Sequence, residues 1–268
     1  MRQVDLAGIE HWDSIYQAVG PAEAWWEPSD YGSITLTRAL VAEMGLSKPA
    51  SILEVGCGNS IWLPYVGLKT GAAVAGLDYS EVGCELARSQ LAAAGVPGKV
   101  FCADLFNLKT AEVGRYDFVY SLGMVEHFTD TVEVLSKLLE LVNPGGVLFT
   151  EVPNLRSIHG LMSWVWHPEL LAKHKLVSKR ELIAAYRKLG LQNVRGHYAG
   201  VFSLDIVAWE IYPRWPRLVP KLLPKIKRAR NSVDYRLRRR GRFGGVAPLA
   251  PYLYVVGQKQ PETAQGKV

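Results

Sequence analysis

The chain has 268 residues, of which 49% are hydrophobic, and a formal net charge of +6, which suits one well-packed domain with an insertion or two small domains. No run of 18 apolar residues is present to span a bilayer, and the acidic residues in the N-terminal MRQVDLAGIEHWDSIY argue against the apolar centre of a signal peptide. The cysteines Cys57, Cys84 and Cys102 form no closely spaced pair, so we expect no zinc site, no disulfide and a reducing, cytoplasmic setting.

The first two thirds of the chain alternate between predicted strands and helices. Residues 1–47 form an N-terminal helical segment in this prediction, and the β-branched runs SILEV, AAVAGLD, KVFCAD, YDFVYSL and GGVLFTEV follow it. Helical character lies between them at 80–95 and at 129–146, where an apolar stripe ends at Asn143-Pro144-Gly145-Gly146. Apolar strands that alternate with helices predict a doubly wound α/β fold with a parallel sheet covered on both faces.

The last third of the chain follows a different pattern. A capping box from Ser178 to Glu181 opens a predicted helix over 178–191. Two further strands, NVRGHYAGVFSLDIV and PYLYVVGQKQ, are separated by a proline-punctuated basic stretch that is too long for a hairpin loop. We therefore predict a core over 48–207 and 249–260, an insertion at 208–248 and a disordered tail at 261–268.

A glycine-rich turn follows the first strand, in ILEVGCGNS, where it is typical of a nucleotide-binding site. Glu54 precedes Gly56 and Gly58, and the next two strands end near Asp78 and Asp104. The fingerprint of NAD-dependent enzymes requires a third glycine, where this chain has Ser60, and no residue pattern for hydride transfer is present. The NAD-enzyme interpretation is therefore disfavoured.

These motifs resemble those of the class I S-adenosylmethionine-dependent methyltransferases, over residues 48–155. The resemblance implies a Rossmann-like, seven-stranded, mostly parallel sheet with an antiparallel last strand. It also implies S-adenosylmethionine as the methyl donor and S-adenosylhomocysteine as the product. In that family the glycine turn lies against the methionine part of the donor, the acid of the second strand binds the ribose hydroxyls, and the next acid binds the adenine amino group. Matched to this chain, the expected donor-binding residues are Glu54, Gly56, Gly58, Asp78, Tyr79, Asp104, Leu105 and Leu122.

The same resemblance implies a lid and a catalytic side. HWDSIYQ resembles the lid helix of these enzymes, so Trp12 and Tyr16 are expected to cover the donor or, as an alternative, only to pack on the sheet. His127 is a candidate base because an imidazole titrates near neutrality, and His174 is a second candidate. The Glu126-His127 pair is also frequent where its role is structural. Metal-dependent relatives carry an acid at the position of Gly123, so we expect no metal site.

The excess positive charge is confined to residues 213–242, which contain twelve Lys or Arg and one acid, a net charge of +11. Three interpretations compete for this stretch. It binds an anionic membrane surface at the inner face of the membrane, it grips the phosphates of RNA, or it forms a solvated cap over the active site. A membrane surface or an anionic acceptor is favoured, because the stretch contains few aromatic residues to stack on bases.

The expected activity is O- or N-methylation of a small-molecule or lipid-linked acceptor by in-line methyl transfer. Two alternatives stay open. The first is methylation of RNA or protein, in which the basic stretch binds the macromolecule. The second is a partner subunit that binds the donor without catalysis.

Overall fold

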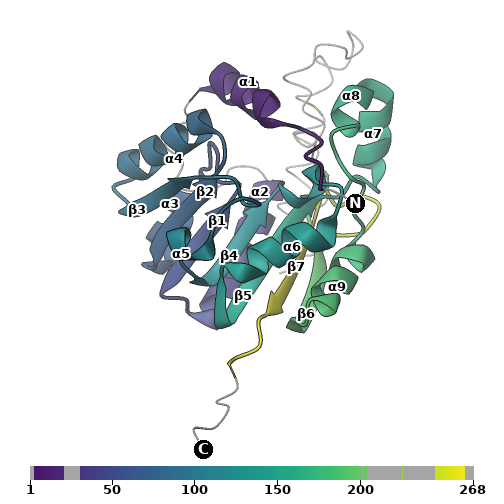
Figure 1. Cartoon of the computed structure of the whole chain (residues 1–268). Helices are drawn as coiled ribbons and strands as arrows, with labels where there is room; N and C mark the ends of the chain where they lie inside the picture. Colours follow the sequence, from purple (N-terminus) through teal and green to yellow (C-terminus); the bar gives the residue numbers. More distant parts are fainter. Residues whose placement is uncertain (1–2, 21–30, 201, 204–224, 226–244, 263–268) are drawn as a thin grey trace, which may run out of the picture.

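The computed structural model describes residues 3–20, 31–200, 202–203, 225 and 245–262. Within them, seven strands form one sheet in the order β3-β2-β1-β4-β5-β7-β6 (Figure 1). Strands β1 to β5 pair in parallel, whereas β7 is antiparallel to both of its neighbours, β5 and β6. The predicted fold class is confirmed. The strands are β1 (Ser51–Val55), β2 (Ala73–Asp78), β3 (Gly98–Cys102), β4 (Tyr116–Leu122), β5 (Val142–Pro153), β6 (Gln192–Ala199) and β7 (Tyr252–Gln258).

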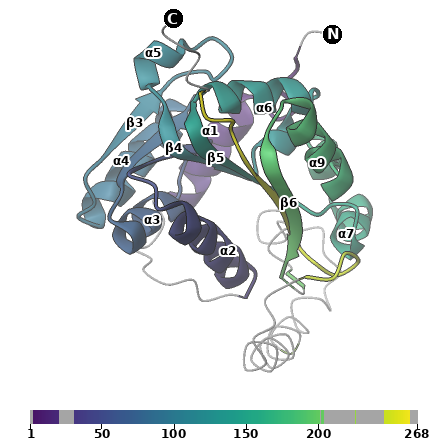
Figure 2. The same cartoon turned by 90° about the horizontal axis from the view of Figure 1, so that it is seen from below.

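Helices cover both faces of this sheet (Figure 2). One core cluster joins Leu40 of α2 and Val66 of α3 to Ile52 of β1. The other joins Leu135 of α6 and Tyr186 of α9 to the opposite face. This is the burial that continuous apolar strands require. The helices that cover the two faces are α2 (Tyr31–Ser47), α3 (Trp62–Thr70), α4 (Glu81–Ala93), α5 (Thr110–Val113), α6 (Thr131–Glu140) and α9 (Lys179–Lys188).

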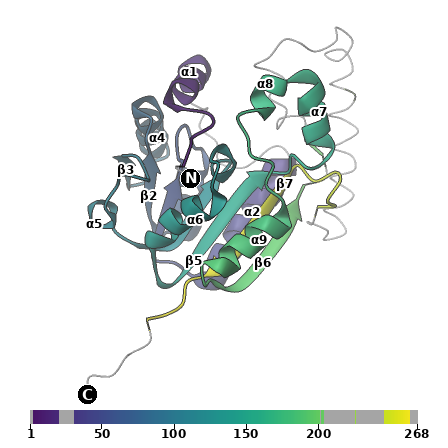
Figure 3. The ribbon, with the colours of Figure 1, turned by 45° about the vertical axis from the view of Figure 1, so that its right-hand side comes forward.

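The remaining helices stand at the end of the sheet where the parallel strands finish, with α1 on one side and α7 and α8 on the other (Figure 3). An N-terminal strap leads into α1, because Asp5 bridges to Phe128 and the Leu6 N–H donates to the His127 carbonyl at 2.8 Å. The strap therefore fixes α1 across the strand ends. These elements are α1 (Ile9–Val19), η1 (Val125–His127), α7 (Ile158–Trp166) and α8 (Pro168–Leu171).

The helix predicted over 129–146 is shorter than expected. It begins after its N-cap Asp130 and ends at Glu140, and the chain enters β5 at Val142. Val142 pairs with Tyr116 of β4, and the Asn143 side chain donates to Asp117 at 2.8 Å. These cross-strand contacts override the local helical pattern of the sequence.

The predicted organisation of the chain is described only in part. Within the predicted N-terminal lid or helical segment, residues 1–47, α2 packs into the core with Leu36, Leu40 and Met44 buried. The basic insertion, apart from Lys225 and residues 245–248, and the tail from residue 263 lie outside the described residues. No helix in the described part of the chain is long and apolar enough to cross a membrane.

Candidate active site

A cavity of about 560 Å³ opens where β1, β2 and β4 end, and α1 lies over it. Its size is typical of a small-molecule or cofactor site. Strand β1 pairs with β2 on one side and with β4 on the other, so the cavity lies at the switch point where open α/β sheets bind ligands. Its lining includes eight of the ten predicted donor residues: Trp12, Tyr16, Gly56, Asp78, Tyr79, Asp104, Leu105 and Leu122.

The turn after β1 requires its glycines. Gly56 and Gly58 have φ angles of +78° and +30°, which other residues rarely adopt. A Cβ atom on Gly58 would lie 2.0 Å from the Tyr16 hydroxyl oxygen, and one on Gly56 would lie 3.1 Å from Met124. Gly58 is therefore covered by the lid and does not line the cavity, whereas Gly56 does.

Glu54 braces this turn from behind. Its side chain is buried and does not line the cavity, which sets Glu54 apart from the other predicted donor-binding acids, Asp78 and Asp104. Its carboxylate accepts hydrogen bonds from Tyr120 at 2.9 Å and from Ser60 at 2.7 and 2.9 Å. The Ser60 hydroxyl in turn accepts from the N–H groups of Trp62 and Leu63 at the start of α3. Serine at the position of the third glycine thus joins the turn to the next helix.

The buried carboxyl of Glu54 predicts a pH dependence of stability. Burial raises its pKa from 4.5 to about 8, although the hydrogen bonds from Ser60 and Tyr120 lower it. Because the folded pKa exceeds the unfolded one, this contribution to stability is complete below the unfolded pKa and is lost as the pH rises through about 8. Between pH 4.5 and about pH 8, ionisation of Glu54 should make the free energy of unfolding of the wild type fall as the pH rises. We expect Glu54→Gln to reduce this fall by up to about 1.4 kcal/mol per pH unit.

Urea unfolding at a series of pH values between the two pKa values measures this slope. Glu85→Gln is the matched control, since Glu85 is an exposed acid on α4 and the control should keep the wild-type slope. A Glu54→Gln slope equal to that of the control would contradict the prediction.

Two acids face the cavity from neighbouring strand ends. Asp78 is 6% exposed, and its two oxygens accept from the N–H groups of Gly58 at 2.8 Å and Ser80 at 2.9 Å. Asp104 accepts from the Phe106 N–H at 2.9 Å and from the Asn107 side chain at 2.6 Å. A carboxylate oxygen has more than one acceptor site, so both acids retain acceptor capacity for hydroxyl or amino groups of a ligand.

Helix α1 supplies the aromatic cover of the cavity. Trp12 and Tyr16 stack with their ring centroids 6.0 Å apart, and Trp12 meets the His127 ring edge-on at 4.9 Å. The Ser80 hydroxyl donates to Asp13, which fastens α1 to the start of α4. Both predicted lid residues therefore line the cavity.

His127 and His174 are adjacent, with ring centroids 4.4 Å apart, but only His127 lines the cavity. Burial lowers the pKa of His127 to about 3, and the nearby His174 adds to the effect. The expectation that His127 titrates near neutrality is therefore wrong, and its imidazole is a weak base at neutral pH. His174 lies behind it, away from the cavity wall.

Sequence reasoning missed the part of the site made by the N-terminal strap. Gln3 and Asp5 line the cavity, and Asp5 accepts a hydrogen bond from the Tyr79 hydroxyl at 2.8 Å. Met124, which contacts the Gly56 turn, was also missed. Asp5 and Tyr79 lie 74 positions apart, and no local pattern marks the pair.

Comparisons with known proteins agree with this architecture. The family profile described as a methyltransferase domain matches residues 33–195. The ubiquinone biosynthesis O-methyltransferase of Bordetella avium (strain 197N) is 28% identical over 203 residues, covering 70% of this chain and 81% of that protein.

Solved structures share the fold at low identity. A putative sarcosine dimethylglycine methyltransferase from Galdieria sulphuraria superposes with a TM-score of 0.61 at 15% identity, over 93% of this chain and 98% of that one. The plantazolicin methyltransferase BpumL, in complex with a triazolic desmethylPZN analog and SAH, superposes with a TM-score of 0.56 at 17% identity, over 94% of this chain and 90% of that one. Because the family profile covers more than half of the chain and includes every strand end that forms the cavity, the protein belongs to the methyltransferase domain family and is a class I S-adenosylmethionine-dependent methyltransferase.

Proposed function

We propose that the protein transfers a methyl group from S-adenosylmethionine to a hydroxyl oxygen of a small aromatic acceptor with an apolar tail. The observation that carries the proposal is the cavity itself, in which a glycine turn, two strand-end acids and an aromatic lid converge. The acceptor class is supported by the 28% identity to a relative named as a ubiquinone biosynthesis O-methyltransferase.

The cavity fits the donor. Asp78, Asp104 and Gly56 line it, and we expect Asp78 to bind the two ribose hydroxyls, Asp104 to bind the adenine amino group and Gly56 to let the donor approach the backbone. When bound, the donor supplies a methyl group already activated on a sulfonium centre. The faces of Trp12 and Tyr16 attract such a cation, by about 0.5–2 kcal/mol each.

The chain contributes chiefly by positioning the reactants. A lone pair of the acceptor oxygen forms the new O–C bond, the S–C bond breaks with its electron pair passing to sulfur, and the hydroxyl proton passes to solvent. Holding the two reactants in line and excluding water contributes up to roughly 7–11 kcal/mol. His127 donates from Nδ1 to the Lys173 carbonyl at 2.9 Å, so its Nε2 is free of a proton. Nε2 therefore keeps its lone pair on a residue that lines the cavity.

An exposed apolar face on α7 supports an acceptor with an apolar tail. Leu161, Trp164 and Val165 are 57%, 65% and 55% exposed on this short helix. The Ile158 N–H donates to Pro248, which brings the exposed Leu249 beside the helix. Apolar clusters of this kind commonly mark interaction sites. We infer that this face inserts into a lipid surface that also holds the apolar tail of the acceptor. In this proposal the basic stretch at 213–242 contacts the lipid head groups; that stretch lies largely outside the described residues.

Leu161→Ser is expected to weaken binding to vesicles of phosphatidylglycerol and phosphatidylcholine by about tenfold, because burying a leucine side chain contributes about 1.5–3 kcal/mol. Co-sedimentation with the vesicles measures this effect. Leu46→Ser is the matched control, since Leu46 is 76% exposed at the end of α2, away from the cavity, and should leave binding unchanged. Equal binding of both variants would contradict the membrane role of α7.

The activity itself is tested by transfer of labelled methyl groups from S-adenosylmethionine into a lysate that is then fractionated. Label in the solvent-extractable fraction is expected. Label confined to nucleic acid or protein would overturn the proposal in favour of a macromolecular acceptor. Donor binding without any transfer would favour the silent partner subunit.

A further inference from the structure

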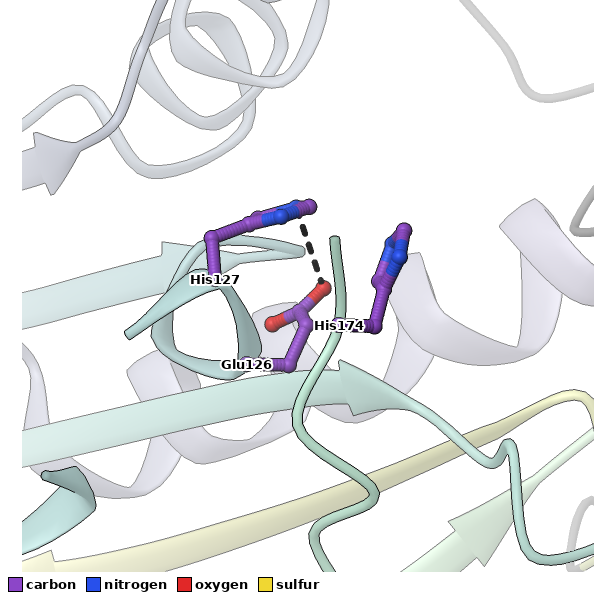
Figure 4. A group of neighbouring side chains, drawn as sticks. All are labelled: Glu126, His127 and His174. Atoms are coloured by element: carbon purple, nitrogen blue, oxygen red, sulfur yellow. Dashed lines mark ion pairs between the residues drawn. The ribbon is translucent and has the colours of Figure 1, made fainter. Parts of the chain in front are cut away.

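Three side chains with metal-binding groups converge beside the cavity (Figure 4). Glu126 and His127 come from η1, and His174 follows α8. One ligand atom from each lies within 4.8 Å of the other two, and His127 Nε2 lies 3.8 Å from Glu126 Oε1. The Lys175 N–H donates to the Glu126 carbonyl at 2.6 Å, which ties the His174 segment to η1. Two segments that are distant in the sequence are thus held together at this point.

Both imidazoles are held by a hydrogen bond from the same ring nitrogen. Nδ1 of His127 lies 2.9 Å from the Lys173 carbonyl, and Nδ1 of His174 lies 2.8 Å from the Leu170 carbonyl. A carbonyl only accepts hydrogen bonds, so each Nδ1 carries the proton and each Nε2 keeps its lone pair. Metal-binding histidines are oriented in this way by a hydrogen bond from the other ring nitrogen.

The third member of the cluster is a buried carboxyl group with an unsatisfied oxygen. Glu126 is 2% exposed, and its Oε2 has no hydrogen-bond partner among the described residues. Its Oε1 lies 3.8 Å from Nε2 of His127, whose imidazole is uncharged at neutral pH. Glu151, which lies opposite Leu122 at the end of the neighbouring strand, also leaves a buried oxygen without a partner. A cation at this point would satisfy groups whose burial is otherwise unfavourable.

We propose that Glu126, His127 and His174 bind one divalent first-row transition metal ion, with Zn²⁺ as the expected metal. Two imidazole nitrogens and one carboxylate oxygen form a ligand set found in catalytic zinc sites, and nitrogen ligands disfavour Mg²⁺ and Ca²⁺. In a tetrahedral site, atoms bound to one ion at about 2.0–2.2 Å lie about 3.3–3.6 Å apart, so the ligand atoms, which lie within 4.8 Å of one another, draw closer by up to about 1.5 Å when the ion binds. This site differs from the sequence expectation of no metal, which depended on Gly123 alone.

Three protein ligands leave a coordination position open, and His127 lines the cavity. If the proposed O-methylation is correct, the acceptor oxygen binds at this position. A hydroxyl on a metal ion loses its proton at lower pH than a free one, and the proton passes to solvent. This role rests on the proposed function, whereas binding of the ion does not.

The test is titration of the metal-stripped full-length protein with Zn²⁺ by calorimetry, and with Co²⁺ by visible absorption, in the absence of donor and acceptor. We expect one ion per chain, and affinities lower by about 100-fold or more in Glu126→Gln and in His174→Ala. His197→Ala, which removes an exposed histidine on β6, is the matched control and should bind like the wild type.

Absence of binding by the wild type would overturn the proposal, as would equal binding by all three variants. Thermal unfolding confirms that each variant is folded. If one of the two ligand variants does not fold, the other still tests the site. Metal binding without methyl transfer to oxygen would leave the site standing and remove the proposed function. Methyl transfer to oxygen by a protein that binds no metal would remove the metal site and leave the proposed function standing.

Discussion

Replacing Asp78 by alanine is expected to weaken binding of S-adenosylhomocysteine by about 100-fold or more. The carboxylate is 6% exposed at the end of β2, where Asp78 lines the cavity, and its oxygens are positioned by the N–H groups of Gly58 and Ser80. Hydrogen bonds to a charged group contribute about 1.5–3 kcal/mol each, and two are lost when the ribose hydroxyls lose their partner. Every 1.4 kcal/mol is a factor of ten in affinity. Titration calorimetry with the product measures the change without requiring turnover.

A matched pair of conservative variants separates the ribose contact from the loss of a charge. Asp78→Asn keeps an acceptor oxygen and removes the charge, so it should lose less affinity than Asp78→Ala. Asp130→Asn makes the same substitution at the N-cap of α6, outside the cavity, where asparagine caps equally well. The control should bind the product normally. Near wild-type affinity in a folded Asp78→Ala protein would remove the ribose assignment.

The donor side of the site could be predicted from the sequence because its signals are local. Asp78 ends β2, Gly56 and Gly58 lie within three residues of the end of β1, and parallel strands bring their ends to one edge. The lid residues Trp12 and Tyr16 could be predicted from the resemblance and their helical spacing. The donor side of the site is built at the strand ends, where the glycines and acids can be recognised in the sequence.

Other features depend on contacts between distant parts of the chain, and the sequence carries no local sign of them. Glu54 looks like a ligand residue, yet Tyr120, 66 positions away, turns it into a brace. His127 looks like a base near neutrality, yet its burial and the approach of His174 lower its pKa to about 3. Only the folded chain shows which side of a turn a carboxylate occupies and how much water reaches an imidazole.

Gly58→Ala is expected to weaken binding of S-adenosylhomocysteine by about tenfold or more, because the new Cβ occupies the space of the lid. That atom would lie 2.0 Å from the Tyr16 hydroxyl oxygen and 2.5 Å from Cζ, so the ring must leave the cavity. The φ angle of +30° adds backbone strain of about 1–3 kcal/mol. Gly71→Ala is the matched control, since Gly71 has a φ angle of +67° and open space around it. The control should lose stability but keep its affinity for the product.

A double-mutant cycle with Tyr16→Ala then decides whether the lid is the cause. If Tyr16 closes over the donor, Tyr16→Ala alone weakens binding, and Gly58→Ala adds little more in that background because the colliding ring is already gone. The loss in the double variant should therefore be smaller than the sum of the two single losses, by about 1 kcal/mol or more. Additive losses would mean that Gly58 acts through the backbone of the turn alone. Unchanged binding by Tyr16→Ala alone would mean that α1 packs on the sheet without covering the donor, and Tyr16 would lose its place in the donor site.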